Sequence, residues 1–319
     1  MLGEDIIFTG DFSHSGKQQI SGRFRRGELV KLACGMYVPR DTFAGLRPGE
    51  KSVLRSGALG ISGRVLVGRS AGAMWRLPQV DERHGFQPEV KGRTDAPLPG
   101  VINRFCSDAG KTQFTWAGRR IAVTSPELTA IDIARWHGLN EAVIVGDQLA
   151  NCGLITHTLL IKALAQRRRA AGIATARAAV GLINNLSESP RESEVKAALY
   201  ENHIHGFRQQ VTIISSAGKR IGRLDFFNRE HSVGLEYDGH GKTHGQFGTS
   251  PDVAREKERA RERELVSEGI YLVRVDKDMF ASGEWLESLT RALEANRGRC
   301  FPQEQVLPPN RHSYTAGWS

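Results

Sequence analysis

Two short strand patterns in the last third of the chain restrict its fold more than any other feature. The run ISSAGKRIGRLDFF places β-branched and aromatic residues on both sides of a turn signal at Gly218 and Lys219. The run HSVGLEYDG then alternates three apolar residues, Val233, Leu235 and Tyr237, with small or acidic ones. Because only the polar segment NREH separates them, the two runs predict an antiparallel hairpin.

Three acidic residues stand at the ends of these predicted strands. Asp225 closes the first strand, and Glu236 and Asp238 close the second. Since strand side chains repeat every second residue, Glu236 and Asp238 are expected on one face of the hairpin. Carboxylates gathered at neighbouring strand ends are typical ligands of Mg²⁺, the ion that phosphodiester hydrolysis usually requires. The same spacing also fits a solvated strand face with two surface acids.

The acids follow the pattern D-x10-E-x-D, and a His-containing loop, a charged helix and a further strand come after them. This order resembles the PD-(D/E)XK nuclease superfamily, most closely the branch related to very-short-patch repair endonucleases. The resemblance covers about Ser187 to Val275. It implies a restriction-endonuclease-like α/β/α domain over residues 186–297 and Mg²⁺ or Mn²⁺ as cofactor. It also implies Asp225 and Glu236 as metal ligands.

The resemblance assigns roles to further acids. Glu192, in the predicted entry helix SPRESEVKAAL, corresponds to an additional acid near the metal. Asp238 stands where many members carry the lysine that orients the attacking water, so we expect it to help hold the metal. A proton acceptor must then come from elsewhere.

The loop GHGKTHG supplies the candidates for proton transfer. His240 and His244 carry imidazoles, whose ordinary pKa of about 6.5 suits proton exchange at neutral pH. Lys242 is a candidate for stabilising the charge on the reacting phosphate and for contacting nucleic acid. The same three residues also fit a glycine-rich loop whose polar side chains face water.

The charged segment from about Asp252 to Glu268 predicts a helix supported by weak ion pairs between residues three or four apart. Those pairs explain the stability of the helix without any function. In the resembling nucleases, however, this helix packs beside the metal site. Arg261 is therefore expected to contact the scissile phosphate or to pair with Glu236. The proline-rich, polar residues 298–319 predict a disordered tail.

The first 50 residues predict a second module. The segment QQISGRFRRGELVKLACGMYVPR indicates a short basic helix, a turn at Gly27 and a hairpin. Its spacing G-x-L-x-x-L-x-x-G-x-Y resembles the winged helix-turn-helix that opens antitoxins of abortive-infection type IV toxin–antitoxin systems. This implies a winged helix over residues 1–50 with DNA as partner, and four phosphate contacts: Arg23, Arg25, Arg26 and Lys31. Arginine-rich surface helices also occur on proteins that never meet DNA.

The middle region, residues 51–185, predicts a mixed α/β arrangement. Its segments GRVLVGRSAGAMWRLP and GRRIAVTSPELTAIDIARW resemble parts of the same antitoxin family. Asp132 lies within an apolar helical stripe and is interpreted as a structural acid. The segment DERHGFQPEVKGRTDAPLPG indicates a surface connection. The run Arg167 to Arg169 indicates a solvated helix end, or a contact with a DNA backbone.

Composition sets the outer limits. A chain of 319 residues is long enough for several domains, and its formal charge of +9 favours a polyanionic partner such as nucleic acid. The four cysteines are far apart and form no C-x-x-C pair, which argues against zinc and a disulfide framework. No apolar run approaches the length of about 18 residues that marks a membrane helix, and no signal-peptide layout is visible. We expect a soluble, cytoplasmic protein without membrane contact.

These observations predict an α+β or α/β multidomain protein with two candidate functions. The first is a DNA-binding, metal-dependent endonuclease that acts in phage defence or DNA repair. The second is an antitoxin-type autorepressor whose nuclease-like domain has lost its chemistry, with a nucleotidyltransferase-like toxin as a further partner. A target of RNA, or the toxin itself, is a third reading of the basic charge.

Overall fold

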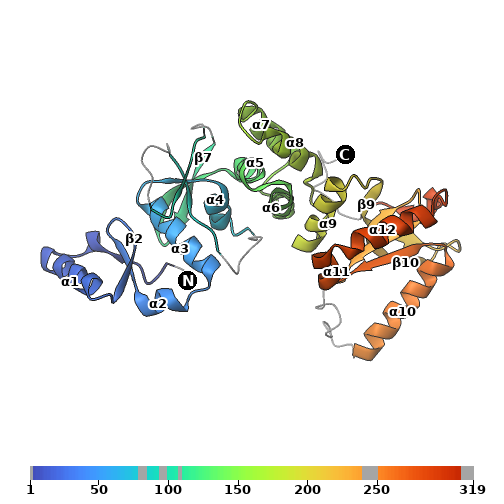
Figure 1. The fold of residues 1–319 in the computed structure, drawn as a ribbon, viewed down its shortest axis with the longest axis horizontal. Coiled ribbons are helices and arrows are strands. Elements are labelled where there is room, and N and C mark those ends of the chain that lie inside the picture. The colour runs from blue at the N-terminus through green and yellow to red at the C-terminus, as the bar shows by residue number, and fades with distance from the viewer. Residues whose placement is uncertain (1–2, 78–84, 93–98, 107–109, 239–250, 310–319) are drawn as a thin grey trace. The chain divides into compact units, whose positions relative to one another are not determined.

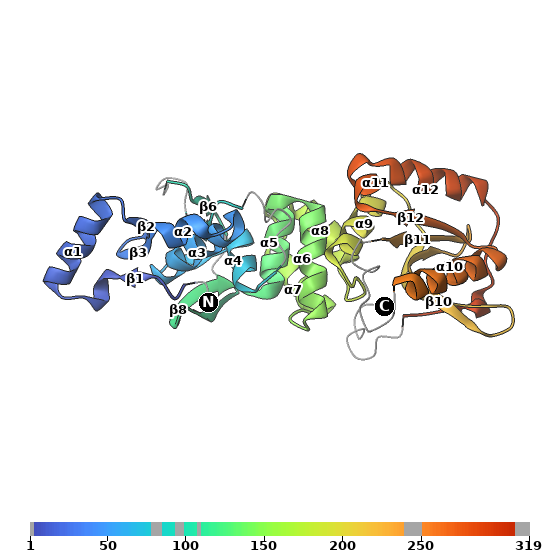
Figure 2. The same ribbon diagram turned by 90° about the horizontal axis from the view of Figure 1, so that it is seen from below.

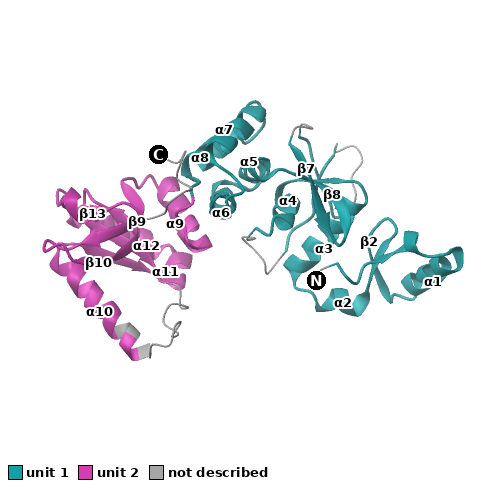
Figure 3. Ribbon diagram, turned by 180° about the vertical axis from the view of Figure 1, so that it is seen from behind, with its two compact units in different colours: residues 1–184, 318 teal, residues 185–317, 319 magenta. Residues whose placement is uncertain are grey.

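The computed structural model describes residues 3–77, 85–92, 99–106, 110–238 and 251–309. The chain divides after Asn184 into two compact units, shown in different colours in Figure 3. Three sheets and the helices around them make up the described residues, so the predicted mixed α/β class is confirmed at this level (Figure 1). The division falls next to the predicted start of the C-terminal domain at residue 186.

The first unit opens with a small antiparallel sheet in the order β1-β3-β2. Its elements are β1 (Ile7–Phe8), the 3-10 turn η1 (Thr9–Asp11), α1 (His14–Arg25), β2 (Leu29–Ala33) and β3 (Met36–Pro39). Gly27 connects α1 to β2 with a φ of +79°, a conformation that glycine adopts without strain. The predicted basic helix, turn and hairpin are therefore present. Among the described residues before the hairpin, α1 is the one α-helix, so a complete helix-turn-helix is not seen there.

The predicted domain boundary at residue 50 does not separate two cores. Helices α2 (Arg40–Gly45) and α3 (Pro48–Ile61) follow the hairpin. Met36 and Val38 of β3 share one hydrophobic cluster with Leu54 and Ala58 of α3. Because these side chains bury one another, the hairpin packs against α3 in a single core within the first unit.

A second sheet, in the order β6-β5-β4-β8-β7, forms the centre of the first unit. Its strands are β4 (Val65–Leu66), β5 (Glu89–Lys91), β6 (Ile102–Arg104), β7 (Lys111–Trp116) and β8 (Arg119–Thr124). The helices that accompany it are α4 (Gly68–Met74), α5 (Pro126–His137), α6 (Leu139–Asn151), α7 (His157–Gln166) and α8 (Ile173–Leu182). Ser125 directly precedes α5, and its hydroxyl donates to the Glu127 carboxylate at 2.7 Å.

The buried acids Asp132 and Glu89 test three of the predictions for this region. The fully buried Asp132 accepts hydrogen bonds from Arg135 at 2.6 Å and from Arg167 at 3.1 Å, which confirms it as a structural acid. Arg167 is itself buried, so the solvated helix end predicted there is wrong for this residue. The predicted surface connection contains β5, whose Glu89 is fully buried against Arg104 and His137. Periodicity missed Glu89 because a buried, paired carboxylate looks like a surface one in sequence.

The second unit is built on a five-stranded sheet in the order β12-β11-β10-β9-β13. Its strands are β9 (Phe207–Ile214), β10 (Arg220–Asn228), β11 (Val233–Tyr237), β12 (Tyr271–Val275) and β13 (Val306–Leu307). Its helices are α9 (Pro190–Glu201), α10 (Pro251–Ser267), α11 (Lys277–Ser282) and α12 (Glu284–Ala295). Neighbouring strands are antiparallel except β11 and β12, which run parallel.

Helices cover both faces of this sheet (Figure 2). On one face, Trp285 and Leu289 of α12 pack with Val195 of α9 and with Leu235 of β11. Trp285, Leu289 and Ala292 are spaced four and three residues apart, so they form one buried stripe along α12. On the other face, Leu265 of α10 belongs to a separate cluster.

The end of the chain corrects one prediction. Composition predicts a disordered tail over residues 298–319, but β13 pairs with β9 through Val306 and Ile213. Phe301 is buried and meets Phe227 edge to face, with ring centroids 5.5 Å apart. Residues up to 309 therefore belong to the second unit, and residues 310–319 lie outside the described residues.

Replacing Phe301 with Ala is expected to destabilise the second unit by about 3–5 kcal/mol, because it empties a buried aromatic site. Urea unfolding followed by circular dichroism measures the change. Leu307→Ala is the matched control, since this β13 side chain is 43% exposed and its truncation removes little buried area. A Phe301→Ala chain as stable as wild type would restore the disordered-tail prediction.

Candidate active site in the C-terminal unit

The predicted hairpin is present as β10 and β11. Phe226 pairs with Leu235 and Asn228 with Val233 in an antiparallel ladder. Asp225 does not close its strand, because β10 continues for three residues to Asn228. The ladder instead ends at Phe226 and Leu235, one residue before the two acids.

Where β10 and β11 separate, the side chain of Asp225 takes the place of a main-chain hydrogen-bond acceptor. Its carboxylate oxygen Oδ2 accepts a hydrogen bond from the backbone N–H of Tyr237 at 3.1 Å. The side chain is nearly buried, with 9% of the residue exposed. The carboxylate thus provides an acceptor for a backbone N–H beyond the end of the β10–β11 ladder. This bond fixes Asp225 beside the strand that carries Glu236.

Glu236 points to the face of the sheet that α10 covers. Its Oε2 accepts a hydrogen bond from Arg261 Nη2 at 2.8 Å and lies 4.0 Å from Arg274 Nη2. Only 14% of the Glu236 side chain is exposed. Burial raises the pKa of Glu236 above its ordinary 4.5; Arg261 lowers it, the Asp225 charge raises it and Arg274 lowers it. Asp225 and Glu236 thus lie close enough to repel each other.

Two arginines tie the surrounding acids together. Arg261 donates to Glu258 on its own helix through Nε at 3.0 Å and through Nη2 at 2.6 Å. Arg274, on β12, bonds Glu258 and lies 3.8 Å from Asp238. The hydrogen bond from Arg261 is the main reason that the pKa of Glu258 is below its usual range. Of the two roles expected for Arg261, the structure has the contact with Glu236.

Glu192 is buried at the start of α9. Its Oε1 accepts from the Ser189 hydroxyl at 3.1 Å, and the Ser189 oxygen accepts in turn from the Glu192 N–H at 3.3 Å. Its Oε2 accepts from the backbone N–H of Glu188 and from Gln210 Nε2, both at 2.8 Å. Glu192 therefore closes the N-terminus of the helix and connects it to β9.

The other predicted residues are distributed as follows. His240, Lys242 and His244 lie outside the described residues. Asp238 is the last described residue of its segment and is 43% exposed at the side chain.

In the first unit, Arg23 and Arg26 both bond Glu28, at 3.2 and 2.6 Å. Arg25 and Lys31 are exposed, and they form no ion pair within the described part of the chain.

Asp225 and Glu236 fit a divalent cation as a pair of hard oxygen donors from neighbouring strands. Burial is the main cause that raises the pKa of Glu236, and the Asp225 charge raises it further; a cation between the two acids would offset both effects. Within the described ranges, no group of three or more His, Cys, Asp or Glu side chains converges on one point. All four cysteines are free, and they are widely separated in sequence.

Sequence reasoning missed two residues of this region, Arg274 and Gln210. Arg274 is the one charged residue in the apolar run YLVRV, and its register partner on β11 is Glu236. A charge inside a predicted buried strand was the signal for it. Gln210 lies in the run FRQQVTII, where neighbouring glutamines gave no comparable signal.

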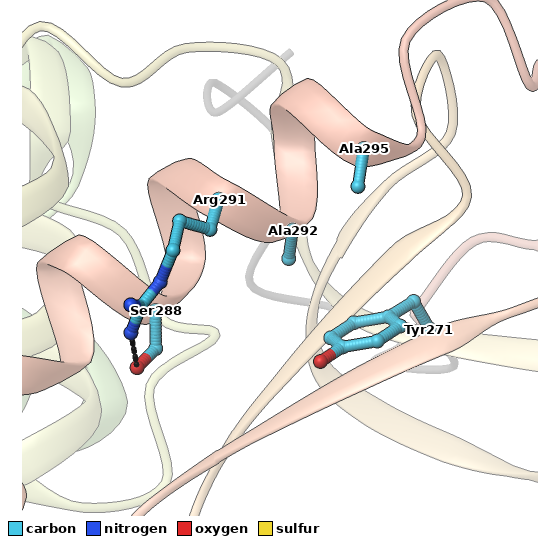
Figure 4. Close-up of a pocket in the computed structure, with 5 residues that line it drawn as sticks. All are labelled: Tyr271, Ser288, Arg291, Ala292 and Ala295. Carbon is cyan, nitrogen blue, oxygen red and sulfur yellow. Dashed lines mark hydrogen bonds between the residues drawn. The ribbon is translucent and has the colours of Figure 1, made fainter.

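A hollow of about 340 Å³ lies elsewhere in the second unit (Figure 4). It is lined by Tyr271 of β12 and by residues of α12, namely Ser288, Arg291, Ala292 and Ala295. The α12 face is opposite to the one on which Glu236 meets α10. None of these five residues is a predicted site residue, so the hollow is separate from the candidate site.

No protein-family model matches the chain, and a search of curated proteins finds no match. Within the described residues, no helix is both long enough and apolar enough to span a bilayer.

The carboxyl of Glu236 is expected to titrate above 4.5, because the folded state disfavours its charge. Its protonation then stabilises the fold, and this stability, fully present below pH 4.5, is lost as the pH rises through the folded pKa. Carboxyl carbon shifts measured by NMR against pH give the value directly. Asp225→Asn should lower it by removing the neighbouring charge, and Arg261→Gln should raise it. An equal pKa of Glu236 in wild type, Asp225→Asn and Arg261→Gln would contradict the proximity of Glu236 to Asp225 and Arg261.

Proposed function

We propose that the protein is a DNA-binding endonuclease whose C-terminal unit hydrolyses phosphodiester bonds with the help of Mg²⁺ or Mn²⁺. The observation that carries the proposal is the meeting of Asp225 and Glu236 at the point where β10 and β11 part. Asp225 is buried and only 14% of the Glu236 side chain is exposed, so two like charges on neighbouring strands are costly unless a cation binds between them. The resemblance to PD-(D/E)XK nucleases supports the same assignment.

Asp225 and Glu236 are the proposed ligands, and a metal contact by Asp238 remains a prediction from the sequence. When bound, the cation acts as a Lewis acid on the phosphate and lowers the pKa of water. The chain itself fixes the donors beforehand. The Tyr237 N–H holds Asp225, and Arg261 holds Glu236. Donors fixed in this way need no rearrangement when charge develops in the transition state.

The two arginines suit a phosphate as well as the acids. Arg261 Nη1 and Arg274 Nε are buried and have no hydrogen-bond partner among the described residues. Arginine presents several donors in a planar fork that matches phosphate oxygens. We infer that these donors contact the DNA backbone beside the carboxylates. Proton transfer by His240 or His244, and a phosphate contact by Lys242, remain predictions from the sequence.

The first unit is the proposed DNA-binding part, through α1 and the β2–β3 hairpin. Its exposed Arg25 and Lys31 carry the electrostatic contact, while Arg23 and Arg26 are partly neutralised by Glu28. A protein that acts on cellular DNA and has four free cysteines is assigned to the reducing cytoplasm in this proposal.

One observation favours a second candidate, the antitoxin-type autorepressor. Arg261 and Arg274 already offset the charges of Glu236, Glu258 and Asp238. Acids satisfied by arginines can serve as a structural network in a unit that binds DNA without cleaving it. A nucleotidyltransferase-like toxin encoded beside this chain would support that candidate.

Supercoiled plasmid incubated with the protein and Mn²⁺ is expected to become nicked, and EDTA should prevent the reaction. Asp225→Ala and Glu236→Ala should reduce nicking to the level seen in EDTA, because each removes a metal ligand. Glu264→Ala is the matched control, since this acid of α10 pairs with the exposed Lys219 away from the candidate site. Retardation of the plasmid on gels without nicking would favour the autorepressor.

DNA binding by the first unit is expected to depend steeply on salt. Each phosphate contact removed should reduce the slope of log affinity against log salt by about 1. Arg25→Ala and Lys31→Ala should each show this change in fluorescence anisotropy titrations. Arg26→Ala should show less, because Glu28 already offsets its charge. Identical slopes for all three variants and wild type would exclude this surface as the contact.

A further inference from the structure

Gln210 combines two costly features inside the sheet of the second unit. It lies within β9, yet its φ is +55°, in the left-handed region that side chains other than glycine rarely occupy. The residue is also almost fully buried, with 1% of its surface exposed. Backbone strain of this kind costs about 1–3 kcal/mol and gathers at functional sites.

Only one of the two polar atoms of the Gln210 side-chain amide has a hydrogen-bond partner among the described residues. Its Nε2 donates to Glu192 Oε2 at 2.8 Å. Its Oε1 is buried and has no hydrogen-bond partner among the described residues. A buried acceptor without a partner loses its hydration and gains nothing in return. A buried acceptor without a hydrogen-bond partner therefore indicates that Oε1 binds a ligand.

The register places Gln210 in line with the candidate site. Val211 pairs with Leu224 and Gln209 with Phe226, so by position Gln210 falls opposite Asp225. Phe226 pairs in turn with Leu235, so Asp225 falls opposite Glu236. Gln210, Asp225 and Glu236 therefore occupy one row across three adjacent strands, β9, β10 and β11.

We propose that Gln210 Oε1 is a ligand of the divalent cation bound by Asp225 and Glu236. The inference rests on the proposed function and adds a neutral oxygen to its two carboxylates. Hard cations accept amide carbonyl oxygens together with carboxylates. Glu192 holds Nε2, so it fixes the rotation of the amide and thereby the position of Oε1. This gives Glu192 a positioning role in place of direct contact with the metal.

Isothermal titration of the full chain with Mn²⁺ tests the assignment without any measurement of cleavage. Gln210→Met keeps the length of the side chain and removes Oε1, and we expect it to bind Mn²⁺ about tenfold more weakly or worse. Gln209→Met is the matched control, because the neighbouring amide bonds Ser187 and has no assigned ligand. The control should keep the wild-type affinity.

Gln210→Leu provides a second variant if Gln210→Met does not fold. It also removes Oε1, so it should bind Mn²⁺ about tenfold more weakly or worse. Wild-type affinity in either folded variant overturns the role of Gln210 alone. A wild-type chain that takes up no Mn²⁺, or an Asp225→Ala chain that binds it normally, overturns the metal site and the proposed function together.

Discussion

The ion pair between Glu236 and Arg261 is the interaction on which the candidate site depends. It joins β11 to α10 at 2.8 Å, with both side chains largely withdrawn from water. Taking two charges out of water is expensive, and their attraction compensates only when the remaining donors and acceptors are also bonded. Arg261 meets this requirement in part through Glu258, but its Nη1 has no partner among the described residues. The pair is therefore held in place, and Arg261 keeps one donor that a further ligand can use.

The irregularities of the sheet lie along the same row of residues. The β10–β11 ladder stops beside Asp225, and the carboxylate takes over one of its hydrogen bonds. On the next strand, Gln210 has a left-handed backbone and an open acceptor. Hydrophobic clusters on both faces of the sheet secure the surrounding strands, so the unsatisfied groups are confined to a short stretch. Such a distribution separates a stable scaffold from a small region with incomplete bonding, as proteins commonly do at functional sites.

Much of this second unit follows from the sequence, because its strands alternate regularly and its turns carry glycine or short polar connectors. The hairpin was predictable in that way, and the helix α10 was predictable from its ion pairs between residues three or four apart. The ends of elements were not, since β10 runs past Asp225 and β13 forms from a polar, proline-rich segment. Buried charges were harder still. Glu89 and Arg167 were predicted at the surface and Arg274 was not singled out, because only partners far away in the chain explain their burial or pairing. Gln210 needed both its backbone angle and its unsatisfied oxygen, neither of which is visible in a sequence.

A crystal structure of the full chain soaked in Mn²⁺ and measured at a wavelength with strong anomalous scattering tests the central claim most directly. The account predicts one anomalous peak within coordination distance, about 2.0–2.6 Å, of Asp225 and Glu236 oxygens, with Arg261 still bonded to Glu236. A well-ordered site without a peak would contradict the account and leave these acids as a structural network.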